Sequence, residues 1–347
     1  MKTKTFTVYL AALCLAAWRL PAAGGAGAHC FVAESGTGII YEYAPDGTQT
    51  AFATNTGRPY GLGCDSAGNL FVANFNGGIF KIAPDGSESV FADLYNGPAG
   101  VAVDNSGDLF VGVYGNGYIF EYAPDGTQSI FGQEPDQGSG NGRPVGLAFD
   151  HAGTLYASDE YYGLIYRGVP GSPFAYPPGD PWGLAFDSRS NLFVADSSGG
   201  TLYKYANVNG TLSSSYTTFA TGMTEPTGLA CDSNDSLFVA DYIAGKVYKF
   251  DTNGVQTTFA SGLHAPIAVA FSPVSQPSGQ LPLLVWLTGN RVAVSWQNTG
   301  SYTLQQNNNL ANPSGWETSG YTITTANGTN SITITSPTGN LYFRLRQ

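Results

Sequence analysis

One short sequence unit recurs six times along this chain of 347 residues. Its clearest element is an apolar, strand-like segment of the form Phe-Val-Ala-Asp. Copies of this segment begin at Phe31, Phe71, Phe110, Tyr156, Phe193 and Phe238. A second element, Pro-x-Gly followed by apolar residues, begins at Pro59, Pro98, Pro144, Pro181 and Pro226, with a sixth copy at Pro266 that carries Ala268 in place of the glycine. Self-similarity at about 41 residues restricts the chain to repeat architectures.

Each unit contains four short apolar segments, which we name strands A (GLAFD), B (LFVAD), C (IYEYA) and D (TQTAFA) in chain order. Turn sequences such as Asp65-Ser66-Ala67-Gly68-Asn69 and Pro45-Asp46-Gly47 separate them, and glycine in such turns tolerates a positive φ. Repeated four-stranded units predict an all-β fold, a six-bladed β-propeller. The first copy lacks strand A, so we expect the segment 266–272 to pair beside Phe31 and close the ring.

The pattern Pro-x-Gly-(Leu/Val)-Ala-x-Asp…Leu-Phe-Val-Ala-Asp resembles the NHL-repeat family of six-bladed β-propellers over residues 29–275. Gluconolactonase-like and streptogramin-lyase-like propellers are related to this family. The resemblance implies the fold, but it leaves the function open, because the family includes scaffolds, sensors, lyases and hydrolases.

Residues 1–28 have the form of a signal peptide. Lys2 and Lys4 precede an apolar run, and small residues end at Ala28. We expect cleavage near Ala28, with Ala23 as the alternative site and a membrane anchor as the alternative role. The mature protein is then secreted, periplasmic or on the cell surface. It keeps Cys30, Cys64 and Cys231, which replace apolar residues of the repeat and are expected to be buried, unpaired thiols.

The C-terminal part of the chain differs from the repeats. Residues 276–280 are expected to be a linker, and residues 281–347 a small β-sandwich-like domain that resembles fibronectin-type-III-like modules of secreted bacterial proteins. Glu317 is the only acid of this segment, which contains no His, Cys, Lys or Asp. We therefore expect attachment or spacing rather than chemistry from it.

Strand parity sorts the loops between two faces of the propeller. The B–C and D–A loops share one face, here the loop face, and the A–B and C–D turns share the other, the turn face. The turn face has a uniform Asp- and Gly-rich sequence, whereas the loop face is variable and aromatic. Our candidate ligand-binding residues on the loop face are Tyr60, Phe75, Tyr95, Tyr114, Tyr161, Tyr162, Trp182, Tyr242, Arg58, Arg143, Asp180 and His264. The long D–A loop from Gly132 to Arg143 is expected to lie over this face. The alternative is that many of these rings only pack between blades.

The same face also contains candidate metal-binding and catalytic residues. Strand B ends in Glu34, Asp159, Asp196 or Asp241 in four copies, which suggests either a calcium site or carboxylates that hold their own loops. Resemblance to gluconolactonases implies Asn or Asp ligands between Pro and Gly, but Tyr60, Ala99, Val145, Trp182, Thr227 and Ile267 stand there. Resemblance to streptogramin lyases implies loop-face histidines, and only His264 is placed there. We therefore predict no metal, no cofactor and no catalytic residue.

Composition narrows the partners. A formal net charge of −11 argues against nucleic acid, and no apolar run beyond the signal segment could span a bilayer. The sequence thus predicts a monomeric binding scaffold for a carbohydrate or protein ligand. The alternative is a propeller enzyme of the lactonase/hydrolase or streptogramin-lyase-like type.

Overall fold

A computed structural model describes residues 8–9, 28–133, 142–168 and 173–273, and the segments 284–288, 291–297, 303–307, 317–318, 320–326, 329–335 and 342–346. These residues form strands and turns without a helix. The chain divides into two compact units, one of residues 27–275 and one that combines residues 1–26 with residues 276–347.

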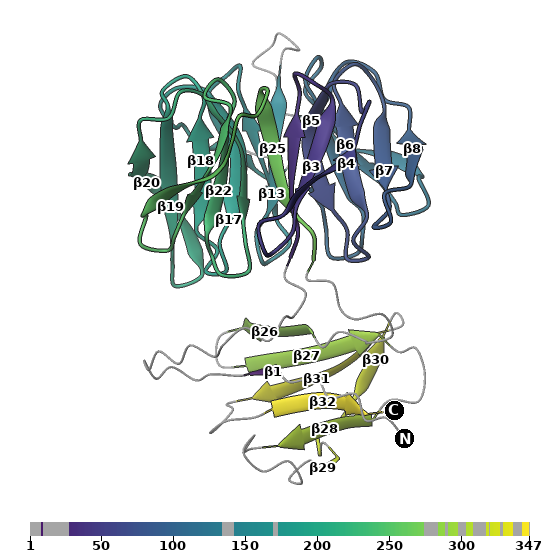
Figure 1. The fold of residues 1–347 in the computed structure, drawn as a ribbon. Coiled ribbons are helices and arrows are strands. Elements are labelled where there is room, and N and C mark those ends of the chain that lie inside the picture. Colours follow the sequence, from purple (N-terminus) through teal and green to yellow (C-terminus); the bar gives the residue numbers. More distant parts are fainter. Residues whose placement is uncertain are drawn as a thin grey trace. The chain divides into compact units, whose positions relative to one another are not determined.

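The first unit consists of six antiparallel four-stranded sheets arranged as a ring (Figure 1). We number these blades 1–6 and give their strands in the order A to D. Blade 1 contains β25 (Pro266–Phe271), β2 (Cys30–Glu34), β3 (Ile39–Tyr43) and β4 (Gln49–Ala53). Blade 2 contains β5 (Pro59–Cys64), β6 (Leu70–Asn74), β7 (Ile79–Ile82) and β8 (Glu88–Ala92). Blade 3 contains β9 (Pro98–Val103), β10 (Leu109–Val113), β11 (Tyr118–Tyr122) and β12 (Gln128–Gln133).

The second half of the ring repeats the pattern. Blade 4 contains β13 (Pro144–Phe149), β14 (Leu155–Asp159), β15 (Leu164–Arg167) and β16 (Pro173–Ala175). Blade 5 contains β17 (Pro181–Phe186), β18 (Leu192–Asp196), β19 (Thr201–Val208) and β20 (Thr211–Thr221). Blade 6 contains β21 (Pro226–Cys231), β22 (Leu237–Asp241), β23 (Lys246–Phe250) and β24 (Gln256–Ser261). The predicted six-bladed β-propeller is confirmed.

Ring closure joins the two ends of the propeller sequence in one sheet. Strand β25 pairs antiparallel with β2, so that Phe31 lies opposite Ala270. The backbone N–H of His29 also donates to Ser272 Oγ at 2.9 Å, across 243 residues of sequence. The ring therefore has no free inner strand edge at the point where the chain enters and leaves it.

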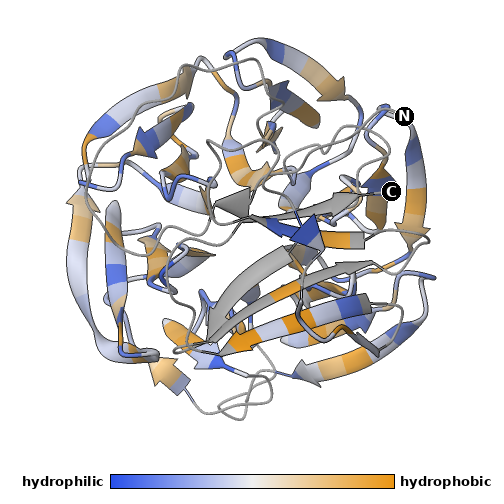
Figure 2. Cartoon of the chain, turned by 90° about the horizontal axis from the view of Figure 1, so that it is seen from below, coloured by the Kyte–Doolittle hydropathy of each residue, from blue (hydrophilic) through white to orange (hydrophobic). Residues whose placement is uncertain are grey.

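The hydrophobic core lies between neighbouring blades rather than inside one of them. The cluster between blades 1 and 2, for example, joins Phe31 and Ile40 to Leu62 and Val72. All five residues of each B strand are buried, whereas most D strands begin with three exposed residues. Figure 2 views the ring along its axis and shows hydrophilic and hydrophobic residues alternating on the outermost strands. This gradient agrees with blades stacked around a central axis.

The three cysteines among the described residues, Cys30, Cys64 and Cys231, occupy apolar positions of the repeat and are unpaired. Cys30 is buried in β2, while Cys64 and Cys231 are half-buried at the ends of their A strands. Burial raises the pKa of Cys64 to about 12 and that of the other two thiols beyond their usual range. These thiols are therefore poor nucleophiles at neutral pH.

The second unit contains two four-stranded sheets. One has the order β26 (Leu284–Thr288), β27 (Arg291–Gln297), β31 (Thr329–Thr335) and β30 (Thr324–Ala326). The other has the order β1 (Val8–Tyr9), β32 (Tyr342–Arg346), β28 (Thr303–Asn307) and β29 (Glu317–Thr318). Strand β1 belongs to the expected signal peptide, so cleavage near Ala28 would leave that sheet with three strands.

Candidate binding site on the loop face

The six A strands approach one another closely around the ring axis, and this approach explains the glycine of the Pro-x-Gly repeat. A Cβ atom on Gly146 would lie 2.0 Å from the carbonyl oxygen of Trp182, and one on Gly183 would lie 2.1 Å from that of Thr227. No side chain fits at such distances. Blade 1 alone accepts Ala268 at this position.

Next to that glycine, each A strand has a register irregularity against its B strand. In blade 2 it falls between Pro59 and Gly61, and in blade 4 between Pro144 and Gly146. Such bulges re-aim the side chain of the extra residue. Four of the six residues between Pro and Gly line the channel along the ring axis, namely Tyr60, Val145, Trp182 and Ile267.

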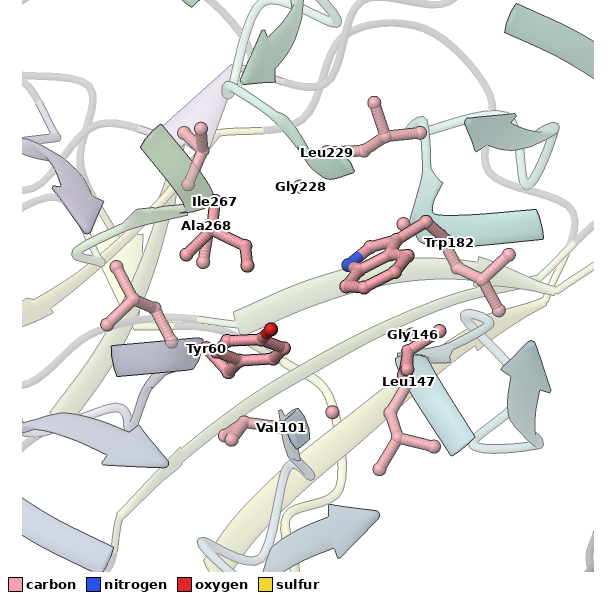
Figure 3. A pocket seen from close by; sticks show the side chains of 16 residues that line it. Tyr60, Val101, Gly146, Leu147, Trp182, Gly228, Leu229, Ile267 and Ala268 are labelled. Carbon is pink, nitrogen blue, oxygen red and sulfur yellow. The ribbon is translucent and has the colours of Figure 1, made fainter. Parts of the chain in front are cut away.

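The channel is almost filled. Its lining comes from all six A strands, and the remaining space is about 50 Å³, enough for a few water molecules. Tyr60 and Trp182 face each other at the mouth, with ring centroids 6.2 Å apart (Figure 3). A ligand larger than water must therefore bind over the channel rather than inside it.

Around this mouth, aromatic rings and two arginines form a continuous arc. Tyr60 contacts Phe75 at 4.4 Å between ring centroids, and Phe75 contacts Tyr114 at 5.4 Å. The guanidinium of Arg58 lies 5.0 Å from the centroids of both Tyr60 and Phe75, within the range of a cation–π contact. Arg58 Nη2 also donates to the Tyr60 hydroxyl at 3.0 Å.

The second part of the arc belongs to blades 3 and 4. Arg143 lies 4.6 Å from the ring centroid of Tyr114 and 4.9 Å from that of Tyr161. Its Nη1 pairs with Glu160 Oε2 at 3.2 Å. We call the set Arg58, Tyr60, Phe75, Tyr114, Arg143, Glu160, Tyr161 and Trp182 the mouth arc.

Titration behaviour reflects the partly dry surroundings of the mouth. Burial raises the pKa of the Tyr60 phenol, while Arg58 opposes the shift. The pKa of Tyr114 is raised mainly by burial and secondarily by the charge of Glu160. The pKa of Glu225 is raised mainly by burial and secondarily by the charge of Asp241. Both phenols therefore stay protonated at neutral pH. The Tyr114 phenol already has Glu160 as its hydrogen-bond partner, whereas the Tyr60 phenol accepts from Arg58 and can donate its own proton to a ligand.

The acids that end the B strands hold the loops of this face. Asp241 Oδ1 accepts the backbone N–H groups of Glu225 at 3.0 Å and Ala244 at 3.1 Å, and its Oδ2 accepts that of Thr224 at 2.8 Å. In four other blades a backbone N–H of the D–A loop donates to the equivalent side-chain oxygen. These pairs are Arg58 N–H to Asn74, Arg143 N–H to Asp159, Asp180 N–H to Asp196 and His264 N–H to Glu34. We call these side chains at the ends of the B strands, Glu34, Asn74, Asp159, Asp196 and Asp241, the latches. Each latch binds its own B–C loop, as predicted, and also the backbone of the preceding D–A loop.

This arrangement bears on the calcium alternative. The carboxylate oxygens of Asp241 are occupied by amide N–H groups, which are competitors of a cation. In the part of the chain that the structure describes, no three His, Cys, Asp or Glu side chains gather in a way that could hold a metal ion.

The structure brings most of the predicted site residues together around the mouth and leaves the others outside it. Arg58, Tyr60, Phe75, Tyr114, Arg143, Tyr161 and Trp182 belong to the mouth arc. Tyr162 packs on Tyr161 at 4.9 Å, and Tyr242 packs against the same hydrophobic cluster as Tyr60 and Trp182. Tyr95, Asp180 and His264 lie outside the arc. Tyr95 is 72% exposed, while Asp180 and His264 contribute backbone N–H groups to the latches. Most of the loop predicted over this face, residues 134–141, lies outside the described residues.

Sequence reasoning missed Glu160 and Tyr176. Glu160 directly follows the latch acid Asp159, so that blade 4 ends its B strand in two acids, and this doubling was the available signal. Tyr176 is 70% exposed in the D–A loop between blades 4 and 5. Nothing in the repeat pattern distinguishes it from a packing residue.

Comparison with solved structures confirms the propeller fold, and the similar structures include a lyase and gluconolactonases. A streptogramin B lyase superposes with a TM-score of 0.54 at 14% identity, covering 77% of this chain and 94% of the lyase. A gluconolactonase of Xanthomonas campestris gives 0.51 at 20% identity, covering 68% and 82%. A putative gluconolactonase gives 0.51 at 15% identity, covering 92% and 93%. At such identities the likeness shows the fold alone.

Sequence-level comparisons add no family. No protein-family model matches the chain, and no curated protein matches it either. No helix among the described residues has the length and apolarity to cross a membrane.

Proposed function

We propose that this chain is an exported binding protein whose propeller holds a carbohydrate or protein ligand on the mouth arc. The observation that carries this proposal is the contiguity of the arc across blades 2 to 5. Rings and guanidinium groups from separate loops contact one another around one opening, and the latches fix the backbone beneath them. A rigid, partly apolar surface with few polar groups is the usual form of a ligand site.

The surroundings of the arc support binding from solution. Tyr161 is 50% exposed and Ile243, in the B–C loop of blade 6, is 61% exposed. Aromatic groups left exposed on a rigid frame lose little conformational entropy when a ligand covers them.

A catalytic role of the lactonase kind finds less support in these residues. The six positions between Pro and Gly hold Tyr60, Ala99, Val145, Trp182, Thr227 and Ile267, none of which is a carboxylate or carboxamide. Thr227 is buried and donates to the Ala240 carbonyl. Of the histidines expected for a lyase of the streptogramin type, His151 contacts Ser190 on the turn face. His29 contacts Glu42 at the ring closure.

Export, a monomeric state and a spacer role for the C-terminal unit complete the proposal. They rest on the form of residues 1–28 and on the poverty of residues 281–347 in titratable side chains. The fibronectin-type-III-like and NHL-like resemblances belong here as well, as interpretations of the sequence.

The test is a glycan array and a protein-partner capture, each run with wild type and with Tyr161→Ala. A matched control is Tyr216→Ala, which removes a 40% exposed tyrosine from the outer strand β20. We expect ligand binding to fall at least about fivefold for Tyr161→Ala, since a stacked ring contributes on the order of 1–3 kcal/mol. Lactone hydrolysis that requires calcium or zinc and is abolished by EDTA would instead establish the enzyme alternative.

A further inference from the structure

The two arginines of the mouth arc differ in how their charge is compensated. Arg143 is paired with Glu160. For Arg58, no carboxylate among the described residues lies within ion-pair distance, and its side-chain hydrogen bond goes to the neutral Tyr60 hydroxyl. That bond uses one of the five N–H donors of a guanidinium. The arc therefore contains one neutralised cation and one that is available to a ligand.

The position of Arg58 is fixed from several sides. Its backbone N–H donates to Asn74 Oδ1 at 2.9 Å, and its carbonyl accepts the N–H of Phe75 at 2.8 Å. The guanidinium lies over Tyr60 and Phe75. A cation ordered in advance in this way binds an anion without a further ordering cost, and its planar fork matches a carboxylate.

Other charges near the mouth limit the anion. Glu160 and Glu225 both act on the Tyr60 phenol, and the chain carries a net charge of −11. A phosphate or a cluster of acids would be repelled by these carboxylates. A single carboxylate placed against Arg58 fits the local balance of charge.

The shape of the site favours a saccharide over a peptide. Protein partners usually anchor large side chains in desolvated pockets, but the channel leaves only about 50 Å³ below Tyr60 and Trp182. The arc instead offers the half-exposed ring of Tyr161 and the phenol of Tyr60. These suit the apolar faces and hydroxyl groups of a pyranose.

We infer that the ligand of the mouth arc is a carboxylate-bearing saccharide, a uronate, whose carboxylate is bound by Arg58 while its sugar rings stack on the neighbouring aromatic side chains. The inference rests on the proposed binding function and gives its ligand class. Arg58 is then the residue that distinguishes acidic from neutral saccharides.

The experiment compares two probes by isothermal titration calorimetry, a xylotriose that carries a single glucuronate and the methyl ester of the same compound. The proteins are wild type, Arg58→Gln, Arg58→Lys and the control Arg189→Gln, which removes an exposed arginine from the turn face. Equal melting temperatures exclude a folding defect. We expect wild type to bind the acid at least about tenfold more tightly than the ester, as a charge-assisted hydrogen-bonded pair allows. Arg58→Gln should remove this preference, so that acid and ester bind equally whatever the affinity for the ester, Arg58→Lys should keep part of the preference, and the control should match wild type.

Two results would overturn the inference while sparing the proposed function. One is equal binding of acid and ester, with no effect of Arg58→Gln. The other is binding of neither saccharide by a protein that captures an acidic peptide through Tyr161. If no glycan, peptide or protein binds in a Tyr161-dependent way, the proposed function itself fails.

Discussion

Asp241 and Glu225, sixteen residues apart in sequence, are joined by a 3.0 Å hydrogen bond from the Glu225 backbone N–H to the Asp241 carboxylate. The same offset links Arg143 to Asp159 and Asp180 to Asp196. Each latch stands at the end of a B strand and fixes the two loops that carry the candidate binding residues. Blade 3 has Val113 at this position and so lacks the side-chain acceptor, but it keeps the backbone hydrogen bond from the Tyr114 N–H to the Gly97 carbonyl that the other five blades also have at this place.

We expect Asp241→Ala to destabilise the propeller by about 3 kcal/mol, because it leaves three backbone N–H groups without their acceptor. Asp241→Asn keeps one oxygen acceptor, as Asn74 does in blade 2, and should cost about 1 kcal/mol. Guanidinium unfolding followed by tyrosine and tryptophan fluorescence measures both. Equal losses for the two variants would contradict the latch.

Gly146→Ala should be severe, because its Cβ would lie 2.0 Å from the Trp182 carbonyl oxygen and 2.6 Å from Ser158 Oγ. We expect a loss of about 3 kcal/mol or more. Gly100→Ala is the matched control at the same repeat position, where the nearest atom is the movable Leu147 Cγ at 3.0 Å. Thermal unfolding should show the smaller loss for Gly100→Ala, and the reverse order would refute the close-approach explanation.

Tyr122→Phe should leave stability unchanged or raise it by about 1 kcal/mol. The Tyr122 hydroxyl is buried without a hydrogen-bond partner, burial raises its pKa to about 12, and blade 6 already has Phe250 at the equivalent position. Tyr203→Phe is the control, since the Tyr203 hydroxyl donates to Asp196 Oδ2 at 3.3 Å, and its loss should destabilise. Denaturant midpoints separate the two; a clear loss of stability in Tyr122→Phe would count against the unpaired hydroxyl.

Acid should weaken the propeller partly through its C–D turns. Hydrogen bonds from Thr48, Ser87 and Thr127 lower the pKa values of Asp46, Asp85 and Asp125. Because these pKa values are depressed in the folded state, their stabilisation is present above the unfolded value of about 3.9 and is lost as pH falls through the folded values. The variant in which all three aspartates are replaced by asparagine should therefore lose less stability than wild type as the pH falls from about 5 to about 2. This is the pH range over which the three carboxylates become protonated. Identical acid profiles in urea unfolding would show that these turns do not contribute.

The sequence was sufficient for the fold because the repeat encodes contacts within one blade. Turn residues, buried B strands and the Pro-x-Gly element each recur at fixed offsets, and the missing first A strand predicts the ring closure. Parity also assigns the aromatic residues to one face. What it does not determine is which of them touch across the ring axis. Tyr60 and Trp182 meet with ring centroids 6.2 Å apart, and such a contact depends on side-chain sizes in blades far apart in sequence.

The Arg143–Glu160 pair escaped prediction for a similar reason. It joins a D–A loop to a B–C loop through side chains outside the repeat pattern, so only the folded geometry shows that Arg58 is left without such a partner among the described residues. Pairing of charges between variable loops is decided by distances that repeats do not encode.

The pairing of β25 with β2 also sets an order of events in time. Strand β2 is synthesised first among the propeller strands but receives its inner neighbour only after residue 271 has been made. Contacts of such long sequence separation form slowly, and until then β2 presents an open edge that can pair with another chain. A product truncated before Pro266 would keep that edge permanently, and we expect it to aggregate rather than persist as a five-bladed protein.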